Sequence, residues 1–402
     1  MIDTAKYRLY PTAEQRTILA KTFGCGRWVY NYGLGLKKEA WELRQEHVSS
    51  AYISALLPVL KAQEETQWLS EAPSQALQQV VRHLDSAFKN FIAGRARFPK
   101  FKSKYGRQSF VQPQGSSLGE NSVLISKIGK VKAVISKIPA GKVKSVTVSR
   151  TPTGKYFASV LFETPGAPPV KVPTTPAGAV GIDLGLTDFA VLSDGRRVAN
   201  PRHLQKKLRR LKRAQRIHSR RKLLSSNRNK ARHRVAVLHE KVANQRKDFL
   251  HKLSTSIIHD NQVDTVCSED LAVQNMQKNR RLACSISSAG WYTFRRMLAY
   301  KAERMGKNLL VIDRFLPSSK TCSCCGTVKD RLSLAERQWT CQCGAEHDRD
   351  VNAAINIKQF ALNSVRPGRP EFTLGESACR QASVEDGLPA FENQELAVFT
   401  GS

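Results

Sequence analysis

The segment Ala179-Val-Gly-Ile-Asp-Leu-Gly-Leu186 decides how the second half of this chain folds, because it sets one carboxylate, Asp183, inside an apolar run. A short apolar run of this kind is typical of a buried strand. Gly181 and Gly185 would permit another part of the backbone to approach that strand closely. Residues 179–193 therefore predict a buried hairpin that carries an acid.

Two more acids stand at similar junctions. Glu269 ends an apolar strand over 263–267, and Asp350 opens a helix over 351–360, where it could cap the N-terminus. Each acid alone could be a cap or a surface residue, and Asp348 is a rival for the third position. Taken together, an acid on a central strand, one at the end of another strand and one starting a later helix have the layout of an RNase H-like site.

This layout predicts a metal-dependent nuclease. Three carboxylates in one place repel one another and raise each other's pKa unless cations lie between them. Two Mg²⁺ ions about 4 Å apart would activate the attacking water and stabilise the leaving 3′ oxygen of a phosphodiester. We therefore expect Asp183, Glu269 and Asp350 to be both the catalytic residues and the magnesium ligands.

A cysteine cluster lies between the second and third acids. Cys322-x-x-Cys325 and Cys341-x-Cys343, separated by 15 residues, have the spacing of a four-thiolate zinc ribbon. Four thiolates leave no open position, so we expect one structural zinc ion. The second arm is one residue shorter than the usual CxxC, and Cys324 and His347 remain possible substitute ligands.

The net charge indicates a polyanionic partner. The chain has 65 Lys and Arg against 33 Asp and Glu, a formal charge of +32, and nucleic acid is the commonest partner for such an excess. A membrane is not expected, because the chain shows no lipidation signal and no apolar run of the roughly 18 residues that span a bilayer. Nine cysteines, four of them at metal-ligand spacing, fit a reducing compartment.

Two basic segments are the predicted nucleic-acid contacts. Residues 95–107 interleave cations with aromatic side chains, as in loops that hold phosphates and stack bases. Residues 201–252 predict one or two long helices with 19 Lys and Arg but two acids, and such like charges repel unless a polyphosphate balances them. The candidate contacts are Arg95, Arg97, Lys100, Lys102, Lys206, Lys207, Arg209, Arg210, Lys212, Arg213, Arg220 and Arg221.

The first half of the chain predicts helices inserted into a small sheet. Thr12 and Gln15 form a capping-box pattern that opens one helix, a second is expected from Gly26 to about Arg44, and a third begins at Ser74. Period-two alternation over 122–163 predicts an antiparallel sheet, a small barrel completed by the strand over residues 4–10. Five prolines in 163–178 predict a linker.

Four strings carry a family resemblance: GIDLGLTDFAVLSDG (181–195), SEDLAVQNMQKNRRLACSISSAGW (268–291), SSKTCSCCG (318–326) and WTCQCGAEHDRDVNAAINI (339–357). They resemble TnpB, the OrfB-type protein of bacterial insertion sequences and a relative of the type V CRISPR nucleases. The resemblance departs at Ser288, where an acid is usual, and in the shortened Cys341-x-Cys343 arm. It places the family's catalytic acids on Asp183, Glu269 and Asp350.

The resemblance implies a multidomain α+β fold. Its expected parts are a wedge-type β-barrel (1–11 and 95–165), a helical recognition insert (12–94), a Pro-rich linker (166–178), a RuvC nuclease domain (179–316 and 345–362), a zinc ribbon that interrupts it (317–344) and a disordered tail (363–402). The implied activity is RNA-guided DNA cleavage. The implied partners are a guide RNA derived from the transposon end and double-stranded DNA with a short flanking motif.

We also expect a monomer in the ribonucleoprotein, located in the prokaryotic cytoplasm in association with the nucleoid. One alternative is a non-catalytic nucleic-acid-binding accessory protein of a transposon, but a pure binder has no reason to hold carboxylates facing a polyanion. The other is a transposase that joins DNA ends. The order Asp, Glu, Asp argues against it, since strand transfer favours Asp, Asp, Glu.

Overall fold

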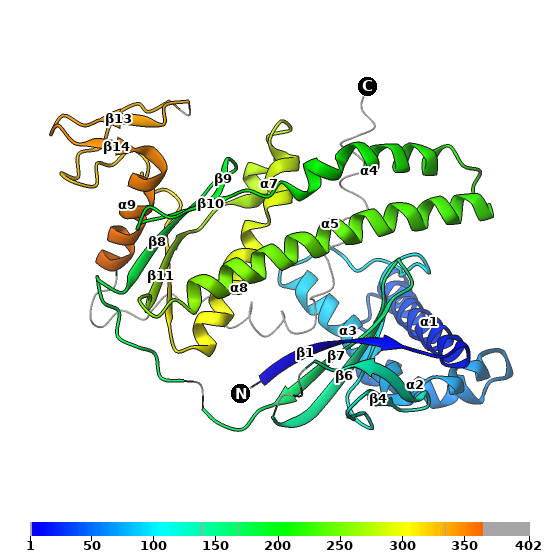
Figure 1. Cartoon of the computed structure of the whole chain (residues 1–402). Helices are drawn as coiled ribbons and strands as arrows, with labels where there is room; N and C mark the ends of the chain where they lie inside the picture. Colours follow the sequence, from blue (N-terminus) through cyan, green and yellow to red (C-terminus); the bar gives the residue numbers. More distant parts are fainter. Residues whose placement is uncertain (1, 137, 139, 168, 334, 365–402) are drawn as a thin grey trace. The chain divides into compact units, whose positions relative to one another are not determined.

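The computed structural model describes residues 2–136, 138, 140–167, 169–333 and 335–364. They form two compact units, Met1–Ala167 and Pro168–Ser402 (Figure 1). Most of the predicted tail, from residue 365 onward, lies outside the described residues. Part of the predicted linker is bonded to the second unit, because the Val172 N–H donates to Gly306 and the Thr175 hydroxyl to Asp264.

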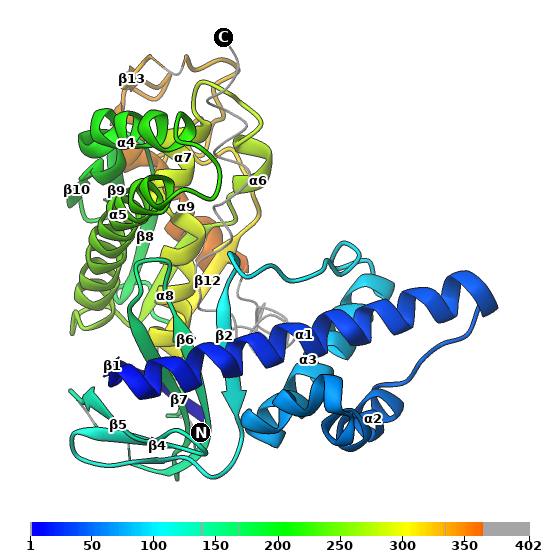
Figure 2. The same cartoon turned by 90° about the vertical axis from the view of Figure 1, so that its right-hand side faces the viewer.

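The first unit contains four helical segments: α1 (Ala13–Arg44), α2 (Ser50–Ala62), the 3-10 helix η1 (Glu64–Glu71) and α3 (Ser74–Ile92). The capping box of Thr12 and Gln15 is confirmed. The predicted break at Gly26 is wrong, since α1 is one continuous helix. A Cβ on Gly26 would lie 3.4 Å from Val80, and one on Gly33 3.0 Å from Leu84. These glycines therefore bring α1 close to α3, beside which it runs in Figure 2.

The strands of the first unit form one antiparallel sheet in the order β2-β6-β7-β1-β5-β4-β3. Its members are β1 (Ile2–Tyr10), β2 (Gln108–Gln112), β3 (Ser117–Leu118), β4 (Ser122–Ile125), β5 (Gly129–Val134), β6 (Lys142–Arg150) and β7 (Tyr156–Glu163). The N-terminal strand joins the sheet as predicted. The sheet is not the closed barrel that the sequence predicts, because the described pairings leave β2 and β3 at its two edges.

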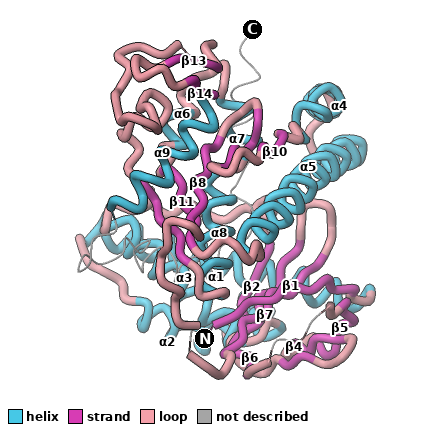
Figure 3. The backbone as a smooth tube through the Cα atoms, turned by 60° about the vertical axis from the view of Figure 1, so that its left-hand side comes forward, coloured by secondary structure: helices cyan, strands magenta, loops and turns pink. Residues whose placement is uncertain are grey.

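The second unit is built on a five-stranded sheet in the order β10-β9-β8-β11-β12 (Figure 3). The strands are β8 (Ala179–Leu184), β9 (Asp188–Leu192), β10 (Arg197–Ala199), β11 (Thr265–Glu269) and β12 (Asn308–Ile312). The predicted hairpin is confirmed in β8 and β9, which pair antiparallel, whereas β8, β11 and β12 are parallel. Parallel strands end at one edge of a sheet, so this order brings the ends of β8 and β11 together.

Helices cover this sheet, and a small two-stranded module is inserted after it. The helices are α4 (His203–Ser219), α5 (Ser226–Ile258), α6 (Val273–Met276), α7 (Ala283–Ala289), α8 (Trp291–Arg304) and α9 (Arg349–Ser364), and the module holds β13 (Gln338–Thr340) and β14 (Glu346–Asp348). The two basic helices predicted over 201–252 are α4 and α5, which pack side by side. Among the described residues no helix is long and apolar enough to cross a membrane.

Helix α9 packs on the central strand β8 at a residue with no side chain. A Cβ on Gly181 would lie 1.9 Å from the carbonyl oxygen of Ala354 and 2.9 Å from the amide nitrogen of Lys358. The close approach predicted at this glycine is thus confirmed. It sets the start of α9 near Asp183, which lies two residues beyond Gly181 on β8.

We expect Gly181→Ala to destabilise the protein. The added methyl group would collide with backbone that cannot swing aside, and overpacking of this kind costs about 1–3 kcal/mol. Thermal unfolding followed by circular dichroism should show a lower Tm. Gly35→Ala is the matched control, since Gly35 lies in α1 and an added Cβ there would meet nothing within 4 Å. A Tm in Gly181→Ala equal to that of the control would contradict the close contact.

Candidate active site

The structure brings the three predicted acids to one edge of the second sheet. Asp183 is on the central strand β8, and Glu269 is the last residue of the neighbouring strand β11. Their strands are in register, with Ile182 opposite Ser268. Asp350 lies in the first turn of α9, the helix that packs on β8.

The electrostatics of Asp183 reflect this arrangement. Burial, together with the charges of Glu269 and Asp350, raises the pKa of Asp183 to about 7, whereas Arg349 and Arg337 oppose the change. Within the described part of the chain, no hydrogen bond reaches the Asp183 carboxylate. Its negative charge is therefore poorly balanced by the protein itself, as expected where cations complete a site.

Glu269 forms a hydrogen bond with Ser318, in the segment that follows β12. Burial raises the pKa of Glu269, and a hydrogen bond from Ser318 lowers it. The Ser318 hydroxyl donates to Glu269 Oε1 over 2.5 Å. The next residue, Asp270, forms ion pairs with Arg295 and Arg314, which anchor the end of β11 from outside the carboxylate cluster.

Asp348 and Asp350 have different roles in this structure. The Oδ1 atom of Asp348 accepts hydrogen bonds from the amides of Asp350 and Val351, at 3.1 and 3.0 Å. Asp348 is therefore the N-cap of α9, and the capping role suggested for Asp350 is wrong. The charge of Asp350 is instead among those that raise the pKa of Asp183.

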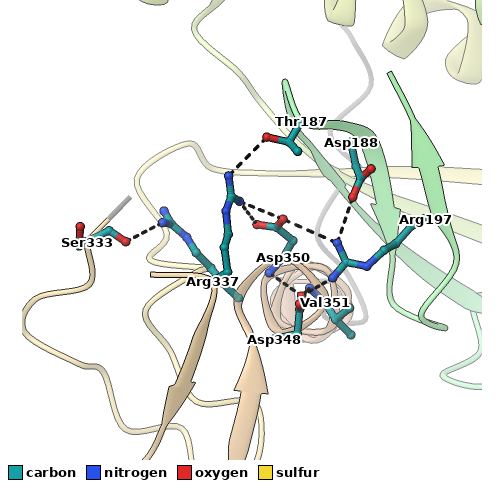
Figure 4. Close-up of polar contacts among 9 residues, drawn as sticks. Thr187, Asp188, Arg197, Ser333, Arg337, Asp348, Asp350 and Val351 are labelled. Atoms are coloured by element: carbon teal, nitrogen blue, oxygen red, sulfur yellow. Dashed lines mark hydrogen bonds and ion pairs between the residues drawn. The ribbon is translucent and has the colours of Figure 1, made fainter. Parts of the chain in front are cut away.

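Two arginines that sequence reasoning missed surround Asp350 (Figure 4). One nitrogen of Arg337 lies 3.1 Å from both carboxylate oxygens of Asp350, and its other nitrogen reaches Thr187. Arg197 joins Asp188, Asp348 and Asp350, at 3.0, 2.6 and 3.9 Å. Nothing in the local sequence marks either arginine, because the contacts link a strand edge and the inserted module to α9.

The described residues do not present the three acids as a ready site for one ion. The groups whose ligand atoms all lie within 4.8 Å of one another are Cys322–Cys325–Cys341–Cys343 and Cys322–Cys324–His347. The carboxylates of Asp183, Glu269 and Asp350 form no such group, so their ligand atoms do not all lie within 4.8 Å of one another. The oxygen-rich donor set is the kind that Mg²⁺ prefers.

The four predicted cysteines come together despite the shortened arm. Cys322 and Cys343 have their sulfurs 3.7 Å apart, and Cys325 and Cys341 have theirs 3.6 Å apart. Zn–S bonds of about 2.3 Å in a tetrahedron put sulfurs ~3.8 Å apart, so the set fits zinc. His347 is buried, packs against Trp339 with the two rings tilted by 44°, and lies 3.0 Å from the Cys322 sulfur.

The predicted nucleic-acid residues lie mainly on exposed surfaces. Most of those on α4 and after it are exposed, as are the arginines of the 95–107 loop. Lys102 differs from the other candidates because its side chain contacts the protein itself. Its ammonium group lies 3.9 Å from the centre of the Tyr30 ring, and its backbone forms hydrogen bonds with the side chain of Asn31. Desolvation, with a smaller contribution from Arg107, lowers the pKa of Lys102 to about 8. Lys102 thus anchors the loop to α1.

We expect one zinc ion per chain, and cysteine variants will identify its ligands. Cys325→Ser and Cys343→Ser should lose zinc, because each removes one of four thiolates. Cys324→Ser is the matched control and should keep it, since Cys324 belongs to the alternative set with His347. Elemental analysis of purified protein measures the content. Loss of zinc in Cys324→Ser with retention in Cys325→Ser would reverse the ligand assignment.

Asp183 should make the stability of the protein fall as pH rises when no Mg²⁺ is added. Its folded pKa lies above its unfolded value, so burying the charged form costs stability from about pH 4 upward, fully so above about pH 7. Asp183→Asn should therefore be more stable than wild type at pH 8, because the amide carries no charge. We expect a difference of about 1–3 kcal/mol, reduced from the full effect of the pKa shift because the side chain keeps some solvent access. The two should converge only below about pH 4, the unfolded pKa of the carboxyl, in thermal melts. Asp248→Asn, an exposed change on α5, should follow wild type; the same pH trend in wild type and Asp183→Asn would contradict the assignment.

Family models match three parts of the chain. The OrfB_IS605 model, described as "Probable transposase", matches residues 159–280, and a model described as "Cas12f1-like, TNB domain" matches 291–357. A third, described as a helix-turn-helix domain, matches residues 1–46, where the structure has β1 and the single helix α1.

Whole-chain relatives and a solved structure agree with these models. A Streptomyces pristinaespiralis protein named "Putative RNA-guided DNA endonuclease" is 44% identical over 387 residues, covering 94% of this chain and 95% of the relative. InsQ of Escherichia coli (strain K12), which carries the same description, is 34% identical over 374 residues, covering 89% and 91%.

Among solved structures, the Cas12f1–sgRNA–target DNA complex contains a similar fold. Its matching chain superimposes with a TM-score of 0.57 at 14% identity, covering 89% of this chain and 98% of that one. The predicted resemblance is thereby confirmed: this chain belongs to the OrfB family of IS605-type insertion sequences, the TnpB-like proteins.

Proposed function

We propose that this chain is an RNA-guided, Mg²⁺-dependent DNA endonuclease associated with a transposable element, with Asp183, Glu269 and Asp350 as its catalytic acids. The names of its relatives support RNA-guided DNA cleavage. A non-catalytic accessory protein would also account for the basic helices and the cysteine cluster, but it gives no reason for three acids at one edge of the sheet.

One observation carries the proposal. The strand order β10-β9-β8-β11-β12, antiparallel on one side of β8 and parallel on the other, is the order of an RNase H-like sheet, in which the first strand is central. Asp183 lies on that central strand, Glu269 ends the adjacent parallel strand, and Asp350 opens the helix packed against them. This arrangement supports a RuvC-type domain over residues 179–316 and 345–362.

Each acid would have a defined task toward two Mg²⁺ ions. When bound, the ions supply an activated water and charge stabilisation at the leaving oxygen of a phosphodiester. Asp183, Glu269 and Asp350 would hold the ions through their carboxylate oxygens. Arg337, which pairs with Asp350 over 3.1 Å, would offer a positive charge to a phosphate near the site. Ser318 keeps one oxygen of Glu269 occupied and leaves the other available.

The basic surfaces would bind the nucleic acids. We assign α4, α5 and the 95–107 loop to the phosphates of a guide RNA and its heteroduplex with DNA, which a protein holds through backbone and shape. In the first unit, the sheet (1–11 and 95–165) and the helices (12–94) correspond to the wedge and recognition parts, and would read a short flanking duplex motif. We further propose that residues 317–344 form a zinc ribbon and that residues 166–178 link the two units. The protein would act as one monomer per guide RNA, in the cytoplasm, on DNA of the nucleoid.

Cleavage by purified ribonucleoprotein tests the proposal. Wild type should cut a plasmid that matches the bound RNA and leave a mismatched plasmid intact. Asp183→Ala, Glu269→Ala and Asp350→Ala should each lower the cleavage rate by at least about 10³-fold while target binding in gel shifts changes little, because lysines and arginines supply the affinity.

Asp348→Ala is the matched control for the third acid. It removes the N-cap of α9, which costs about 1 kcal/mol of stability, and should keep measurable cutting. Normal cutting by Asp350→Ala with loss in Asp348→Ala would reassign the third acid. Equal cutting of matched and mismatched plasmids would refute RNA guidance, and absence of cutting by every form would favour the accessory protein.

A further inference from the structure

The loop between β12 and the cysteine module is a rigid turn. The carbonyl oxygen of Pro317 accepts hydrogen bonds from the amide of Lys320 and from both the amide and the hydroxyl of Thr321. The amide of Ser318 bonds Leu316. Residues 316–321 therefore have little local freedom, although they belong to no regular element.

Two buried amides of α9 fasten this turn from the other side. Asn356 donates to the carbonyl oxygens of Ser318 and Thr321, at 2.8 and 2.6 Å. Asn352 donates to Thr321 over 2.7 Å and accepts from the amide of Ser323 over 3.0 Å. Asn352 is 2% exposed and Asn356 1%, and buried amides are costly unless hydrogen-bonded, so these contacts are strongly favoured.

The turn over residues 316–321 connects two residues of the proposed sites. Ser318, itself 8% exposed, donates its hydroxyl to Glu269. Cys322, one turn later, is the first of the four clustered cysteines. A single short segment thus joins the proposed catalytic edge of the sheet to the proposed zinc site, and the helix that holds the segment also carries Asp350.

We propose that Ser318 is a positioning residue for Glu269. The cysteine module and α9 together would hold Ser318 in place. The inference rests on the proposed function. A glutamate side chain has three rotatable bonds, and a hydrogen bond to Oε1 selects the rotamer in which Oε2 remains available for a metal ion. Hydrogen bonds of this kind to metal-binding groups are worth about 10–100-fold in metal affinity or activity.

The contact is specific to position 318. Ser319, the next residue, is half-buried and has no role in the contacts that fasten the turn among the described residues. Ser319→Ala is therefore a matched control of identical chemistry. A second pair of variants separates the effect of side-chain shape from that of the hydrogen bond. Ser318→Thr keeps the hydroxyl, whereas Ser318→Val has nearly the shape of threonine but no hydroxyl.

The primary measurement is metal binding rather than cleavage. Mn²⁺ binding to the full-length, RNA-free protein is followed by electron paramagnetic resonance, and binding that Asp183→Ala abolishes is counted as site binding. Ser318→Ala and Ser318→Val should bind Mn²⁺ about tenfold more weakly than wild type, with zinc content unchanged. Ser318→Thr and Ser319→Ala should match wild type. Single-turnover cleavage by the ribonucleoproteins should follow the same order.

Several outcomes would overturn the inference. They are wild-type Mn²⁺ affinity in Ser318→Ala and Ser318→Val, an equal loss in Ser318→Thr and Ser318→Val, and loss of zinc in Ser318→Ala, which would assign the serine to the fold alone. Failure of the proposed function looks different. Wild-type ribonucleoprotein would then cut nothing, whereas the Mn²⁺ comparison among the variants would still report on Ser318.

Discussion

The contact between the backbone of α9 and strand β8 at Gly181 is the constraint on which the second unit depends. With no side chain at Gly181, the helix lies directly on the strand. The same helix presents Asp350, Asn352 and Asn356 from its first two turns. A helix displaced outward by even one methyl group would move all three together, because a helix is stiff over this length. The position of Asp350 relative to the two strand acids and the seating of the Ser318 turn thus depend on one backbone contact.

Charge organises the molecule at two scales. Over the whole surface, the excess of lysine and arginine creates a field that attracts nucleic acid from a distance and falls with added salt. Within the site, a few acids oppose that field, and Arg337 and Arg197 lie directly against Asp350 and Asp348. A phosphate backbone would be repelled by bare carboxylates, so the arginines make the same edge of the sheet tolerable to a polyanion before any metal ion is bound.

The sequence reveals the parts of this site that follow local rules and misses those that depend on tertiary contact. Asp183 and Glu269 could be placed because apolar runs mark the strands that carry them, and the cysteines because zinc demands their spacing. The helix cap could not be assigned, since Asp348 and Asp350 are both suitable in sequence and only the geometry of α9 selects Asp348. The continuity of α1 was missed because glycines that usually end helices here make room for α3. Alternation identified the strands of the first sheet, but it carries no information on whether the edge strands meet, and the sheet is open.

The position of α9 along the chain has a consequence for biosynthesis. Asp183 on β8 is made first, Glu269 only after the long basic helices, and Asp350 only after the cysteine module as well. Domains of this kind, whose essential contacts are distant in sequence, assemble slowly and late. A chain made only as far as α5 therefore carries the basic helices but neither Glu269 nor Asp350, so the cluster of acids is completed only when almost the whole described chain has been made.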